Sequence, residues 1–140
     1  MLGPRGYQTR IVASLSLPHG LPDDCLAALI GFQPSHLLEL EIWRRLFATE
    51  FIERREWSLI LFGLSHPDQK AALAMLPPSV HDRLHCLPDE SQAWRTAFEG
   101  QSVVVFPLEK TAMLGPANEE AWDEAQALFR SSLSRRPEEG

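Results

Sequence analysis

The chain of 140 residues is poor in the features that mark cross-linked or membrane-spanning proteins. Its two cysteines, Cys25 and Cys86, form no CxxC pair and are too few for a disulfide framework. We therefore expect two free thiols that pack as small hydrophobic side chains. No apolar run approaches the roughly 18 residues of a membrane span, and the apolar piece at 11–17 is too short for a signal peptide. These absences predict a cytoplasmic protein.

The sequence also lacks the short motifs that carry common catalytic chemistry. It contains no GxSxG nucleophile turn, no HExxH zinc motif and no glycine-rich phosphate loop. Paired acidic residues occur at 23–24, 119–120 and 138–139. The first two pairs lie where predicted helices begin, and helix N-termini favour negative charge, whereas the third lies in a predicted tail. We predict no catalytic residue and no cofactor.

Charge and length narrow the function classes further. The formal net charge of −6 argues against a nucleic-acid-binding protein, which needs a cationic surface to displace counterions from phosphates. The same acidic balance suits a protein that binds a basic partner. The length is typical of one domain. We therefore expect a single domain over 1–140, with 1–8 and 135–140 as flexible ends.

Hydrophobic periodicity and capping residues predict a mainly helical protein. Ser65, Asp89 and Asn118 are the predicted N-caps. The predicted helices span 23–30, 35–56, 66–76, 78–87, 90–99 and 119–136, and the predicted strands span 9–17 and 102–108. The segment 57–64 is either a helix, which we favour, or a buried strand. The expected fold is a compact, mainly α bundle of about five or six helices, several short and bounded by proline, with a small two-stranded ribbon. If 57–64 is a strand, the class becomes α+β.

The stretch HPDQKAALAMLPPSVHDRLHCLP, residues 66–88, begins one helix at His-Pro and ends it at Leu-Pro. It resembles the short-helix repeats in the middle domain of the flagellar motor switch protein and in the cytosolic N-domain of bacterial magnesium transporters. The resemblance covers 66–88 alone. It implies stacked short helices and a scaffold role, and it assigns the chain to no family.

Two histidines within this stretch, His81 and His85, are the candidate metal ligands. If 78–87 is a helix, both lie along one edge of its apolar row, which is the geometry of a two-histidine clamp. Cys86 would then point about 100° away from His85, so one helix cannot bring all three side chains to one ion. A zinc site needs three or four protein ligands, and no spacing identifies the others. Histidines beside an apolar row also lie at the rims of cores.

Four tryptophans and seven phenylalanines are spread over several predicted elements. They build either a large aromatic core or an apolar surface that a partner helix covers. Trp43, Phe47 and Phe51 recur on one face of the predicted 35–56 helix. These three residues are the candidate partner contacts, and they are equally good candidates for the core.

The leading expectation is a non-enzymatic, cytoplasmic protein–protein interaction module: an adaptor, a chaperone-like factor or an assembly subunit of a larger bacterial complex. Its partner would be another protein, either basic or presenting an amphipathic helix, and the broad apolar stripe of 35–56 also suits a homodimer. Two alternatives stay open. One is a small metal-dependent enzyme or sensor centred on His81 and His85, and the other is a small-ligand-binding domain with an aromatic-lined cavity.

Overall fold

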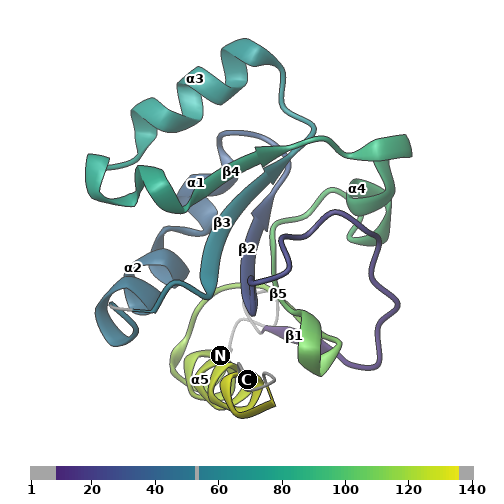
Figure 1. The fold of residues 1–140 in the computed structure, drawn as a ribbon, viewed down its shortest axis with the longest axis vertical. Coiled ribbons are helices and arrows are strands. Elements are labelled where there is room, and N and C mark those ends of the chain that lie inside the picture. The colour runs from purple at the N-terminus through teal and green to yellow at the C-terminus, as the bar shows by residue number, and fades with distance from the viewer. Residues whose placement is uncertain (1–8, 53, 136–140) are drawn as a thin grey trace, which may run out of the picture.

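A six-stranded mixed sheet forms the centre of the computed structural model, which describes residues 9–52 and 54–135 (Figure 1). The strands are β1 (Arg10–Val12), β2 (Ala27–Gly31), β3 (Trp57–Phe62), β4 (Leu84–Leu87), β5 (Val103–Phe106) and β6 (Thr111–Leu114). Their order across the sheet is β1-β6-β5-β2-β3-β4. β2, β3 and β4 run parallel, and the β2–β5, β5–β6 and β6–β1 pairs are antiparallel. The prediction of a mainly α bundle with a two-stranded ribbon is therefore wrong, and the fold is α+β.

Helices cover the two faces of this sheet unequally. The helices are α1 (His36–Glu39), α2 (Glu41–Glu50), α3 (His66–Met75), α4 (Ala93–Ala97) and α5 (Glu119–Arg135), with the 3₁₀ turns η2 (Pro78–Arg83), η3 (Glu90–Gln92) and η4 (Pro107–Glu109). Residues of α1, α2, α3 and α5 share one apolar cluster with the sheet. Residues of α4 and the segment 12–21 pack on the opposite face. Among the described residues, no helix is long and apolar enough to cross a membrane.

The two central strands explain why the helical prediction was wrong. Every residue of β2 and β3 is buried, because each strand has an apolar layer on both of its faces. The sequence of such a strand is a continuous apolar run rather than an alternating pattern. A run of this kind is equally compatible with a buried helix. The helix predicted at 23–30 is instead a turn followed by β2. The helix favoured at 57–64 is β3.

The other predicted elements are correct in part. The predicted helix 35–56 is interrupted at Leu40 and ends at Glu50. The predicted helix 78–87 is a 3₁₀ turn followed by the edge strand β4. The predicted strand 9–17 shortens to β1, which pairs with the unpredicted β6 rather than with β5. The predicted helix 90–99 shortens to α4, preceded by η3.

Three predicted elements are confirmed together with two of their caps. The side chain of Ser65 accepts a hydrogen bond from the Asp68 N–H at the start of α3 (3.3 Å). The side chain of Asn118 accepts one from the Ala121 N–H at the start of α5 (2.8 Å). The predicted strand 102–108 contains β5.

The flexible ends predicted at 1–8 and 135–140 lie outside the described residues except for Arg135. That residue ends α5, and its Nε lies 2.9 Å from a carboxylate oxygen of Glu109. The last turn of α5 is therefore tied to the turn between β5 and β6.

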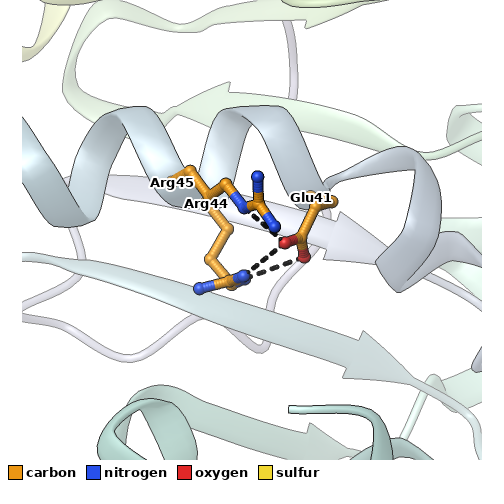
Figure 2. A network of polar contacts seen from close by, with 3 residues as sticks. All are labelled: Glu41, Arg44 and Arg45. Atoms are coloured by element: carbon orange, nitrogen blue, oxygen red, sulfur yellow. Dashed lines mark hydrogen bonds and ion pairs between the residues drawn. The ribbon is translucent and has the colours of Figure 1, made fainter. Parts of the chain in front are cut away.

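A carboxylate with two arginine partners stabilises the start of α2 (Figure 2). Glu41 accepts hydrogen bonds from Nε and Nη2 of Arg44 at 3.2 and 2.6 Å, and from Nε of Arg45 at 2.6 Å. The hydrogen bonds from Arg44 are the main cause that lowers the pKa of Glu41 below its ordinary value. Because Arg44 is buried, the carboxylate compensates a charge that would otherwise be costly to remove from water.

The end of β2 depends on a close contact between Gly31 and His36. A Cβ at Gly31 would lie 2.7 Å from Cβ of His36 and 2.9 Å from a methyl carbon of Leu61, so only glycine fits there. His36 is buried, and its Nδ1 accepts a hydrogen bond from the Phe32 N–H (2.8 Å). Burial lowers the pKa of His36 below 6.5, so the neutral ring is the form that the fold holds.

This buried histidine predicts a loss of stability at acid pH. Because the pKa of His36 is lowered in the folded chain, the unfolded chain takes up a proton first as the pH falls. The free energy of unfolding is then highest above pH 6.5 and decreases below it. In His36→Asn, the amide oxygen can accept the Phe32 hydrogen bond without titrating. We expect this variant to have a flatter pH profile from about pH 6.5 to 5.

Urea unfolding at a series of pH values measures this effect, with His66→Asn at an exposed position as the matched control. The control should keep the wild-type dependence on pH. A His36→Asn profile as steep as that of the wild type would contradict the assignment.

Candidate functional site

The structure separates the two histidines proposed as metal ligands. His81 lies in η2 and His85 lies in β4, so the single helix that would place them on one edge does not exist. Leu84 and Cys86 pack against the cluster that contains α2 and α5, whereas Leu87 packs against the α4 side. Since side chains alternate along a strand, His85 faces the α4 side with Leu87.

The position of His81 explains what its ring does. Its Nε2 lies 3.0 Å from the carbonyl oxygens of both Leu73 and Leu76, at the C-terminal end of α3. Two carbonyl acceptors require a hydrogen on Nε2, so this nitrogen donates to the helix end and has no lone pair free for a metal. Within the described ranges 9–52 and 54–135, no group of three or more His, Cys, Asp or Glu side chains could hold a metal ion.

Neither cysteine has the surroundings of a nucleophile. Cys25 is buried, its Sγ donates to the Ala27 carbonyl (3.3 Å), and burial raises its pKa to about 12. Burial also raises the pKa of the half-buried Cys86 above its ordinary value. Both are free thiols in the protonated form at neutral pH, packed as the sequence predicted.

The three aromatic residues proposed as partner contacts lie in the core. The exposed fractions of Trp43, Phe47 and Phe51 are 1%, 0% and 7%. The ring of Phe47 packs against the rings of Trp57 and Phe129, with centroids 5.6 Å away in both cases. The aromatic stripe of α2 therefore joins β3 to α5 and offers no surface to a partner. The sequence allowed these three residues to be either partner contacts or core residues, and in the structure all three are core residues.

Arg83 lies at the amino ends of β3 and β4 and donates hydrogen bonds to backbone carbonyl groups there. Nη1 of Arg83 donates to the Trp57 carbonyl (3.1 Å), and its Nη2 donates to the carbonyls of Ile52 (3.3 Å) and Arg54 (2.6 Å). Its guanidinium carbon lies 4.0 Å from the centroid of the Trp57 ring. Hollows of about 330 and 190 Å³ flank this contact. Since Arg83 directs its donors to backbone carbonyls, its role at this edge is structural.

A groove of about 520 Å³ lies between the edge strand β1 and the N-terminal half of α5. We call it the acidic groove, and its lining residues are Thr9, Ile11, Asn118, Glu120, Ala121, Asp123 and Glu124. Ile11 pairs with Met113, which belongs to the cluster beneath α5, so Ile11 faces the α5 side of the sheet. It remains 48% exposed because α5 does not cover β1. An apolar side chain thus lies on the floor of a groove with acidic walls.

The acidic wall has an unfavourable arrangement within the helix itself. Glu120 and Glu124 are four residues apart, and Glu120 and Asp123 are three apart, so these like charges lie on neighbouring turns. Such pairs destabilise a helix by about 0.2–0.5 kcal/mol each. In the part of the chain that the structure describes, no ion pair involves these three carboxylates. The groove therefore carries concentrated, uncompensated negative charge.

Sequence reasoning missed this groove. It assigned the acids at 119–120 to helix capping, and it predicted a longer strand, 9–17, in a ribbon with 102–108. The acids at 123 and 124 were a visible signal, since they lie in the second turn of the helix, which gains little from its dipole. The neighbouring strand was not visible, because the pairing of β1 with β6 joins residues about a hundred positions apart.

The contacts of His81 predict that the two histidines differ in their effect on stability. His81→Ala removes the donor to two carbonyls at the end of α3, and we expect it to lower the free energy of unfolding by about 1 kcal/mol. His85→Ala, on the edge strand, should change it by less than about 0.5 kcal/mol. Urea unfolding with and without a chelator measures both. Equal losses in the two variants, together with chelator-sensitive wild-type protein, would support a shared metal instead.

Comparison of the chain with protein-family models, with curated proteins and with solved structures finds no match in any of the three.

Proposed function

We propose that this chain is a non-enzymatic, cytoplasmic protein–protein interaction module, an adaptor or assembly subunit, whose acidic groove binds an extended basic segment of another protein. The observation that carries this proposal is the outer edge of β1 beside the groove, which pairs with no other strand in the described part of the chain. β1 is the terminal strand of the sheet among the described residues. Half of the backbone N–H and C=O groups of such a strand point away from its neighbour and can pair with an added strand.

The side chains of the groove specify the chemistry of that strand. In an extended segment laid along β1, alternate side chains would face α5. There they would meet Ile11 on the floor and the carboxylates of Glu120 and Glu124 on the wall. The matching sequence therefore has an apolar residue at one of these α5-facing positions, with lysine or arginine two residues before it and two residues after it. Backbone pairing would supply affinity, and these alternating side chains would supply specificity.

Charge also favours this occupant over a second copy of the chain. Pairing two β1 strands across a twofold axis would bring two acidic grooves together, and like charges opposed across an interface cost free energy. The net charge of −6 adds a general repulsion between copies. A homodimer through this edge is thus disfavoured, whereas a cationic segment gains at every carboxylate. Because β1 is short, few backbone hydrogen bonds can form and we expect weak binding. Because charge contacts then supply much of the affinity, we expect the binding to depend strongly on salt.

A short, fluorescently labelled peptide with lysines two residues before and two residues after a central valine tests the proposal by anisotropy at low and high salt. Glu120→Gln/Glu124→Gln should weaken its binding about tenfold at low salt and reduce the salt dependence, because two favourable charge contacts are lost. Ile11→Ser should also weaken it. The double variant relieves like-charge repulsion within α5 but also removes the favourable interaction of Glu120 with the helix N-terminus, so its stability should change by less than about 0.5 kcal/mol.

The matched control is Asp23→Asn/Glu99→Gln, which removes the same charge from exposed positions outside the groove. It should bind the peptide within about twofold of the wild type. If both double variants weaken the binding equally, the net charge of the chain would explain the binding and the groove would not. The proposal would also be refuted if a peptide with glutamate in place of each lysine binds equally well. It would be refuted as well if the lysine peptide does not bind at low salt.

A further inference from the structure

A second pocket lies on the other side of the sheet and at its other end. It has a volume of about 430 Å³ and is bounded by residues 18–20, 87–88, 90–91 and 93–94. This position is the carboxyl end of β4, which is the edge strand of the parallel part of the sheet. Its size is within the range of small-molecule sites. The pocket shares no residue with the acidic groove, so a ligand here is independent of the proposed function.

The lining combines an apolar body with one negative charge. Leu87 and two prolines supply apolar surface, Trp94 lies at the pocket with 1% of its surface exposed, and proline has no backbone N–H to offer a ligand. Glu90 is the acidic residue of the lining, and none of the described lining residues is lysine or arginine. Glu90 is exposed, so it attracts a cation and repels an anion through an interaction that solvent partly screens. The chemistry of the lining therefore suits a small apolar molecule with a positively charged group.

Hydrogen bonds hold the walls of the pocket in place. The indole N–H of Trp94 donates to the His19 carbonyl (2.9 Å), which ties the 18–20 loop to α4. The carboxylate of Asp89 accepts from the N–H groups of Trp94 (2.8 Å) and Arg95 (3.0 Å). The ring of Trp94 is also stacked on that of Phe62, with centroids 4.8 Å apart. A pocket held in this way loses little entropy on binding.

One wall adopts a backbone conformation that non-glycine residues rarely take. Ser91 and the residue after it, Gln92, both have φ of +54°. Two consecutive left-handed residues of this type are sterically disfavoured and persist only where surrounding contacts enforce them, and such segments cluster at binding sites. Here the contacts of Asp89 across the turn enforce them. The turn places Glu90 and Ser91 at the pocket.

From this combination we propose that the pocket at the carboxyl end of β4 binds a small apolar amine, with its hydrocarbon body against Leu87, Pro18 and Pro88 and its ammonium group beside Glu90. Ser91 and the imidazole of His19 are the other polar side chains at the pocket, and both can accept hydrogen bonds from an ammonium group. The site is a binding site and involves no covalent step.

Titration with phenethylamine, followed in the assigned ¹H–¹⁵N spectrum of the full chain, tests this assignment. The indole N–H signal of Trp94 and the amide signals of Ser91 and Gln92 should shift and saturate together. Phenylpropionate, which has a similar body and the opposite charge, should leave these signals unchanged. Glu90→Gln should weaken amine binding about fivefold, since one charge contact is lost. Ala93→Phe should abolish binding by filling the pocket.

The matched control is Glu99→Gln, which removes a charge from the same stretch of chain but outside the pocket. It should bind phenethylamine as the wild type does. If Ala93→Phe fails to fold, Glu90→Gln and the charge-reversed probe decide the question. No saturable shift, equal shifts with the amine and the acid, or shifts centred elsewhere in the spectrum would each overturn the proposal.

Discussion

The double-sided burial of β2 and β3 is the constraint on which the rest of this structure depends. Each of these neighbouring strands presents apolar side chains to both faces of the sheet, so neither can be stable unless a layer of structure covers each face. One layer is built by α2 and α5, whose aromatic side chains meet over Trp57. The other is built around Trp94. The parallel pairing of the two strands then requires a helical crossover, which α1 and α2 supply.

This arrangement leaves the two ends of the sheet less covered than its centre. At one end α5 lies over the inner strands but leaves Ile11 of β1 partly exposed, which creates the acidic groove. At the other end the chain leaves β4 through a left-handed turn, which creates the pocket beside Glu90. Both candidate sites thus arise where the covering layers stop. Both are acidic, so we expect each to select a cation, the groove a basic segment of protein and the pocket a small amine.

Sequence reasoning succeeded where local signals determine the structure and failed where distant contacts do. The cap of α5 at Asn118 and the β-branched run of β5 are local, and both were predicted. The apolar run that contains β2 follows two aspartates that resemble a helix start. Only the presence of β3 and β5 on either side makes it a strand. Gly31 directly follows the helix predicted at 23–30, whereas in the structure it is the last residue of β2 and the point at which His36 approaches the backbone.

The candidate sites followed the same pattern. The phase of Trp43, Phe47 and Phe51 was visible in the sequence, but whether their common face is core or surface depends on α5, about 80 positions further along the chain. The histidine pair depended on a helix that the chain does not form, since β3 draws the residues after Arg83 into the sheet. The acidic wall of α5 was visible as a spacing of charges, yet its meaning required the position of β1.

Addition of a strand at the acidic groove is the central claim, and hydrogen exchange of the full chain with and without the lysine–valine peptide tests it most directly. We expect slower exchange upon binding at the amides of β1 and in the first turns of α5, with little change at β4. Protection centred on the β4 end, or binding with no change at β1, would contradict it.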